Sequence, residues 1–324
     1  MSIILFSEIR LDRNVKGYNF PSTINKDEAL EITEKVEYAI RNRKYKKFLT
    51  SEMSSLDKLK HFEENGAGDI FKHEDISSIF ISDEDPAVMV NGTNHISIFS
   101  SSEKLDLKNL YERVSRIDDL IDANVDYAYR EDFGYLTANP QMCGTAMDVT
   151  IYFHLPATAY FGISSLVSSL SKLGYKVSTL SSGAAQSVGS IYKISHERVI
   201  GLEEMEYIDK LLGIAREIVD IEEQNRKKLY LDKIIELEDI VNRAVGVLSH
   251  CRIISEEEMI NKMSDLFLGM ELSILKPKKN MELLKTINSL KNGHLQIERG
   301  SLLDEKSRNI LRANNIRKMM KEVF

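Results

Sequence analysis

Two arginines near the carboxyl end of the chain form a pattern that could bind an anion. They lie in Arg308-Asn309-Ile310-Leu311-Arg312-Ala313. In a helix, residues four positions apart share one face, so Arg308 and Arg312 are predicted to lie one turn apart. Paired guanidinium groups can hold a phosphate through charge-assisted hydrogen bonds. A solvated basic helix face would have the same pattern, because short motifs are weakly specific.

A second block that could carry chemistry spans residues 133–156. It reads Phe133-Gly134-Tyr135-Leu136-Thr137-Ala138-Asn139-Pro140-Gln141-Met142-Cys143-Gly144-Thr145, continues with Ala146-Met147-Asp148, and ends at His154-Leu155-Pro156. Cys143 and Cys251 are the two cysteines of the chain. Two thiols are too few for a disulfide framework and indicate a reducing, cytoplasmic location.

Length and composition are those of a globular protein with two domains. The chain has 324 residues, of which 43% are hydrophobic and 29% charged. Its net charge of -7 argues against nucleic acid as a partner, since a phosphate backbone attracts basic surfaces. No apolar run approaches the roughly 18 residues of a membrane span, and the first residues do not resemble a signal peptide.

The elements that must position these residues change in type along the chain. Short strand patterns occur at residues 76–80, 87–90, 96–99, 150–153 and 191–194, and helical patterns at residues 24–45, 105–129 and 159–173. Their irregular order predicts an α+β domain on an antiparallel sheet.

From Glu203 onward the pattern is almost wholly helical. Helices are expected at residues 203–240, 242–248, 255–275 and 304–324, with loops at 276–280 and 291–294. We therefore predict a first domain over residues 1–202 and a helical second domain over residues 203–324.

Several blocks resemble the ATP:guanido phosphotransferase family, most closely its bacterial protein-arginine kinase (McsB) branch. Gly134-Tyr135-Leu136-Thr137, Pro140, Gly144-Thr145 and His154-Leu155-Pro156-Ala157 keep the frame of that family's signature. The family's SRIRLARN and MVNEEDHIR match residues 7–14 and 89–97, and its VRGIYGEGSEAVGNIFQIS matches residues 177–195 without a gap. The resemblance implies a guanido-kinase-like antiparallel sheet flanked by helices, followed by an all-helical C-terminal domain that dimerises.

The family's phosphate-binding arginines are largely replaced. Aligned on the quoted motifs, they fall on Glu8, Ser97, Asp148 and Ser178, whereas Arg10 and Arg13 remain. Two of these replacements place a negative charge where a polyphosphate would sit, and each should cost several kcal/mol of binding.

The family's catalytic carboxylates and cysteine are replaced as well. The acids fall on Gly92, Thr93, Asn94, Gly183 and Gln186, and Asn139 stands in place of the reactive cysteine. An amide is neither a base nor a charge partner for a guanidinium. Cys143 lies four residues later, and we interpret it as a structural thiol.

Three retained residues each leave two interpretations open. His95 could contact a nucleotide or could be a strand-end histidine bonded to backbone. Arg10 could bind phosphate or pair with a nearby carboxylate. His154 could act chemically, although its place in His-Leu-Pro-Ala favours a structural role.

The resemblance implies one further ligand site. The bacterial kinases carry RDxxRA in a pocket for phosphoarginine, and Arg308, Asn309 and Arg312 occupy that motif. An acid at the second position would recognise the guanidinium half of phosphoarginine better than Asn309 does. Without an intact catalytic set, no metal or cofactor is expected, and Mg-ATP is required only by an active enzyme.

Two functions follow from these replacements. The first is a non-catalytic pseudokinase that regulates the stress response by binding phosphoarginine-marked proteins, a sister arginine kinase or a Clp-type chaperone–protease. The second is an active protein-arginine kinase that uses substitute residues. A third, weaker possibility is a pathway partner that only forms a homodimer or heterodimer through the helical domain.

Overall fold

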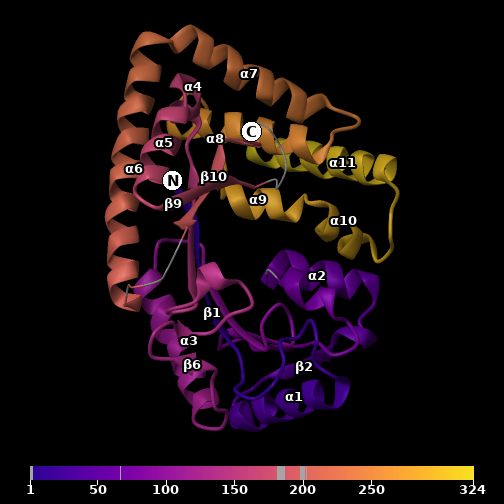
Figure 1. The fold of residues 1–324 in the computed structure, drawn as a ribbon. Coiled ribbons are helices and arrows are strands. Elements are labelled where there is room, and N and C mark those ends of the chain that lie inside the picture. Colours follow the sequence, from indigo (N-terminus) through magenta and orange to yellow (C-terminus); the bar gives the residue numbers. More distant parts are fainter. Residues whose placement is uncertain (1–2, 66, 181–186, 198–200, 202) are drawn as a thin grey trace. The chain divides into compact units, whose positions relative to one another are not determined.

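An eight-stranded sheet and a set of helices make up the computed structural model, which describes residues 3–65, 67–180, 187–197, 201 and 203–324 (Figure 1). The sheet has the strand order β2-β3-β4-β5-β1-β8-β10-β9. Its strands are β1 (Ile4–Arg13), β2 (Lys46–Leu49), β3 (Ser78–Ile81), β4 (Ala87–Val90), β5 (Ile96–Ser102), β8 (Met147–His154), β9 (Tyr175–Thr179) and β10 (Ile191–His196). A hairpin of β6 (Tyr129–Arg130) and β7 (Gly134–Tyr135) forms a separate small sheet.

Helices connect and follow the strands. They are α1 (Lys26–Ile40), α2 (Ser55–Asn65), α3 (Leu107–Asp122), α4 (Pro156–Phe161), α5 (Ser164–Lys172), α6 (Glu204–Asp232), α7 (Ile234–His250), α8 (Glu256–Glu271), α9 (Leu283–Ser289), α10 (Asn292–Arg299) and α11 (Glu305–Val323). Three short 3₁₀ helices are η1 (Thr50–Glu52), η2 (Ala67–Lys72) and η3 (Pro140–Met142). None of the described helices is both long and apolar enough to cross a membrane.

Strand β1 organises the sheet through a strict alternation of side chains. Ile9 and Leu11 are buried on one face, whereas Glu8, Arg10 and Asp12 are half-buried on the other. Strand β1 pairs antiparallel with β5, and β5, β4, β3 and β2 follow as further antiparallel pairs. The predicted antiparallel sheet with flanking helices is therefore confirmed.

The helices after residue 203 pack around an apolar cluster that also includes Val188 and Ile191. Helix α7 packs against α8 and α11, and buried side chains of all three meet in one cluster that includes Leu248, Met263, Phe267 and Ile316. The predicted all-helical C-terminal region is confirmed.

The chain forms two compact units, each assembled from separated segments. The first contains residues 1–6, 151–194 and 213–324, and the second contains residues 7–150 and 195–212. The division into a domain over residues 1–202 and another over residues 203–324 stays a prediction.

Some element boundaries differ from those predicted. The expected helix over residues 203–240 is broken at Lys233, because Leu229 and Leu237 on either side of the break both pack into one cluster with Val241. The expected helix over residues 159–173 is interrupted at Gly162, where φ is 111°. The expected loop over residues 291–294 is wrong, since α10 begins at Asn292 and buries Leu295.

Candidate functional site

The half-buried face of β1 carries several of the positions that the sequence analysis assigned to a nucleotide site. Alternation places Glu8, Arg10 and Asp12 on this face, and Asp12 lies opposite Ser97 of β5 in the strand register. Asp148 of β8 is also half-buried, and its charge acts on Arg10. Among the described residues, this face therefore carries one arginine, Arg10, together with several acids.

The Arg10 guanidinium is held by acceptors of the same unit. Its Nε donates to Asp12 Oδ1 (3.2 Å), and its Nη2 donates to Asp69 Oδ2 (2.8 Å) and Ser97 Oγ (3.2 Å). Ser97 in turn donates to Asp12. Burial lowers the pKa of Arg10, but Asp12 and Asp69 outweigh this effect and the net pKa is raised. The sequence left two interpretations of Arg10, phosphate binding and pairing with a nearby carboxylate. The structure shows the carboxylate pairing.

Asp69 is a site residue that sequence reasoning missed. It lies in η2, whereas the acid expected in this region is replaced by Gly92. A Cβ atom placed on Gly92 would lie 3.4 Å from the Cβ of Asp69. An acid from another segment thus lies beside the position where the family's carboxylate is absent. The polar segment around Asp69 carries no motif that could have indicated this.

Arg13 has a structural environment. Its Nη2 donates to Asp118 Oδ2 (2.7 Å), its Nη1 donates to the Thr145 carbonyl oxygen (3.1 Å), and its Cζ lies 3.7 Å from the ring centroid of Tyr135. The residue is 2% exposed. Burial raises the pKa of Asp118, although the charge of Arg13 opposes that shift. Arg13 therefore joins β1 to α3 within the second unit.

His95 is also engaged by backbone groups. The Val15 amide donates to its Nδ1 (3.0 Å), and its Nε2 lies 2.8 Å from the Asn19 carbonyl oxygen. Because Nδ1 accepts, Nε2 carries the proton and donates to Asn19. Burial lowers the pKa of His95, which favours this neutral form. His95 holds the chain after β1 against the start of β5.

Asn139, which stands in place of the family's cysteine, is the N-cap residue of η3. Asn139 is exposed, and its side chain accepts from the Gln141 amide (3.2 Å) at the start of η3. Cys143 is half-buried, with its Sγ 3.7 Å from Thr137 Oγ1. Ser178 is on β9 in the first unit, and the predicted positions Gly183 and Gln186 are outside the described residues.

His154 lies inside the first unit. It is 1% exposed, and its Nε2 lies 2.8 Å from Ser264 Oγ of α8. Burial, reinforced by the charge of Arg226, holds its pKa well below the usual range. The contacts tie the end of β8 to α8.

Arg312 is completely buried and is bonded to the protein itself. Its donors reach the carbonyl oxygens of Leu290 (2.9 Å) and Ile254 (3.0 Å) and the side-chain oxygens of Asn309 (2.6 Å) and Asn292 (2.6 Å). The Glu256 carboxylate lies 3.6 Å from Nη2. Burial lowers the pKa of Arg312, and Glu256 opposes that shift.

Arg308 differs from Arg312 in its surroundings. It is half-buried, and its Nη1 donates to the Leu303 carbonyl oxygen (2.7 Å), while its buried Nε has no hydrogen-bond partner. The structure thus brings Arg308, Asn309 and Arg312 together on α11. Of the two arginines, Arg308 is the one whose side chain is partly exposed and can be reached by a ligand.

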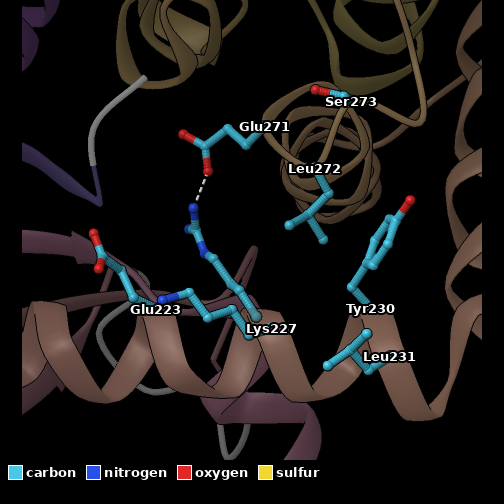
Figure 2. Close-up of a pocket in the computed structure, with 8 residues that line it drawn as sticks. Glu223, Lys227, Tyr230, Leu231, Glu271, Leu272 and Ser273 are labelled. Atoms are coloured by element: carbon cyan, nitrogen blue, oxygen red, sulfur yellow. Dashed lines mark hydrogen bonds and ion pairs between the residues drawn. The ribbon is translucent and has the colours of Figure 1, made fainter.

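A pocket of about 620 Å³ lies between α6 and the carboxyl end of α8, and none of the predicted site residues lines it (Figure 2). Tyr230, Leu231 and Leu272 form apolar walls, and Glu223 and Lys227 stand on α6. Arg226, on the same helix, forms ion pairs with Glu222 and Glu271. The sequence predicts the helix that lines one side of this pocket, α6, but no pattern in it predicts the pocket itself. Among the described side chains, no group of three or more His, Cys, Asp and Glu could hold a metal ion.

Comparison with known proteins defines the class. The family model described as "ATP:guanido phosphotransferase, C-terminal catalytic domain" matches residues 25–225, and "Protein-arginine kinase McsB C-terminal domain" matches residues 234–323. The chain therefore belongs to the ATP:guanido phosphotransferase family.

Within that family the chain is similar to bacterial proteins named protein-arginine kinase. It is 31% identical to the one from Caldanaerobacter subterraneus over 97% of this chain and 96% of the relative, and 30% identical to the one from Clostridium tetani over 98% and 95%. The predicted McsB-like branch is thereby confirmed.

Solved structures support the fold. A duplicated taurocyamine kinase from Schistosoma mansoni matches with a TM-score of 0.60 at 19% identity, over 76% of this chain and 36% of that one. Lombricine kinase matches with a TM-score of 0.61 at 16% identity, over 72% and 69%.

Proposed function

We propose that this chain is a non-catalytic member of the protein-arginine kinase branch. The observation that carries the proposal is the Arg10 guanidinium, which is bonded to Asp12, Asp69 and Ser97 and feels the charge of Asp148. Phosphoryl transfer depends on positive charge gathered around the transferring group. The residues around Arg10 do not fit a triphosphate, because acids surround the only arginine that the described part of this face carries.

The loss of the acid and thiol groups points in the same direction. Gly92 has no carboxylate, and Asn139 caps η3 with its amide. The replacement of any one such group can cost orders of magnitude in rate. Their combined replacement favours a chain that keeps the fold of the family and lacks the phosphoryl-transfer activity.

Incubation with Mg-ATP and an arginine-rich protein tests this proposal. We expect no acid-labile phosphate on the protein substrate, whereas an active bacterial relative assayed in parallel should produce it. Turnover that disappears in the Arg10→Gln variant would show that the chain is an enzyme. A thermal-shift titration with Mg-ATP is the companion measurement, since a ligand that binds the native state must stabilise it.

The second candidate is an active protein-arginine kinase that transfers the γ-phosphoryl group of ATP to arginine side chains. Its support comes from the comparisons, which favour it over the first candidate: full-length relatives at about 30% identity are named protein-arginine kinase. In this case Asp69 is the carboxylate available beside Gly92 for a substrate guanidinium. Mg-ATP would then be the phosphoryl donor.

A non-catalytic protein of this branch would act through binding. We propose phosphoarginine-marked proteins as its ligands, with a sister kinase or a Clp-type chaperone–protease as cytoplasmic stress-response partners and with dimerisation through the helical region. Arg308 is the residue we assign to the phosphate, because its side chain is partly exposed and its Nη1 donates only to the Leu303 carbonyl oxygen among the described groups. Calorimetry should show binding of free phosphoarginine but not of arginine, and loss of that binding in Arg308→Ala; equal or absent binding of both ligands would refute the site.

A further inference from the structure

The ion pair between Arg10 and Asp69 joins β1 to a segment outside the sheet. Asp69 Oδ2 accepts from Arg10 Nη2 at 2.8 Å, and the two side chains remain 20% and 32% exposed. Lys72 also approaches Asp69, with 3.6 Å between Nζ and Oδ1. One carboxylate therefore neutralises part of two cationic groups at a place that solutes can reach.

The packing of η2 fixes where this carboxylate stands. Ile70, the next residue, is fully buried and packs with Ile79 of β3 and Met89 of β4. Gly92 lies against this segment: a Cβ there would be in van der Waals contact with it, 3.4 Å from both the Cβ of Asp69 and the Cγ2 of Ile70. A longer side chain at position 92 would have to share space with Asp69. The size of the residue at position 92 therefore affects where the Asp69 side chain can lie.

We propose that Asp69 is an internal competitor for anions. By holding Arg10 and neutralising Lys72, it keeps this face of β1 closed to phosphate-containing ligands, and the absence of a long side chain at position 92 leaves it the space to do so. Release of Asp69 frees donors of Arg10 and Lys72 and removes one of the negative charges that Arg10 shares with Asp12 and Asp148, so the balance at this point shifts toward anion binding. The inference concerns anion binding alone, so it stands or fails separately from the proposed lack of phosphoryl transfer.

Calorimetric titration with inorganic tripolyphosphate at low ionic strength tests the proposal, because screening is weakest there. We expect Asp69→Asn to bind at least tenfold more tightly than the wild type. The double variant Arg10→Gln/Asp69→Asn should lose that gain. Asp75→Asn is the matched control, since Asp75 is exposed nearby and its substitution changes the net charge equally. It should leave the affinity at the wild-type level.

A second variant displaces Asp69 without altering it. The backbone at Gly92 is outside the left-handed region, so Gly92→Gln is compatible with it, and the added side chain must compete with Asp69 for space. Gly92→Gln should also gain affinity for tripolyphosphate, and it decides the matter if Asp69→Asn does not fold. Equal affinities of Asp69→Asn and Asp75→Asn, a gain that survives Arg10→Gln, or no gain in Gly92→Gln would each overturn the proposal.

Discussion

The guanidinium of Arg13 stacks on the ring of Tyr135 while it donates to Asp118, and Arg312 donates to carbonyl oxygens from two distant segments. Both groups are buried charges that the protein itself satisfies, which is the condition for burying a charge at acceptable cost. The sequence predicted correctly that Arg312 shares a helix with Arg308 and Asn309. It could not show the carbonyl partners, since these approach from segments about 20 and 60 residues away.

Removal of the Arg312 guanidinium should strongly destabilise the fold. Arg312→Met leaves buried carbonyl oxygens and Glu256 without their partner, and the loss in unfolding free energy should be about 3–5 kcal/mol. Arg308→Met is the control, because the half-buried Arg308 makes a single resolved hydrogen bond, and it should cost about 1 kcal/mol or less. Urea unfolding measures both. Similar losses in the two variants would contradict a structural role specific to Arg312.

At the scale of elements, hydrophobic periodicity indicated most helices and the central strands. Strand β4 is found at residues 87–90 as predicted, and the helices over 255–275 and 304–324 are α8 and α11 with trimmed ends. The break between α6 and α7 was missed because it follows from packing around Leu229 and Leu237 and no Gly or Pro marks it. Asp69 was missed for a related reason: tertiary packing of η2 brings it to Arg10.

Two glycines on neighbouring helices should respond in opposite ways to alanine. A Cβ on Gly269 of α8 would lie 2.4 Å from Cγ1 of Val241 on α7, whereas one on Gly246 of α7 would meet nothing within 4 Å. Gly269→Ala should therefore cost roughly 1–3 kcal/mol, since the stiff valine cannot move away freely. Gly246→Ala should stabilise by up to about 1 kcal/mol through helix propensity. Thermal unfolding of the pair checks the assignment, and shifts of the same sign would contradict the close crossing of α7 and α8.

Buried histidines couple the stability of the whole molecule to pH. Burial lowers the pKa of His95 and of His154, and it lowers the pKa of His196 to about 4. Unfolded histidine titrates near 6.5, so below that pH the unfolded state binds protons that the native state refuses. Stability is therefore complete above about pH 6.5 and is lost as the pH falls from there.

The free energy of unfolding should thus decrease between pH 7 and pH 5. His154→Gln removes one contributing group and should flatten the dependence by roughly 1 kcal/mol per pH unit, because His154 is fully buried. Urea titrations of wild type and variant at several pH values give the two slopes. Parallel slopes would mean that His154 is protonated in the native state.

The central place of β1 in the sheet has a consequence for how the molecule is made. Ser7 pairs with Ser102 of β5, and the Asp12 amide donates to the carbonyl oxygen of Ala146 beside β8, so both partners come far later in the chain (Figure 1). At typical synthesis rates the ribosome needs on the order of 10 s to reach the first of them. During that interval the nascent strand has neither neighbour, and its alternating apolar side chains stay open to aggregation or to a chaperone.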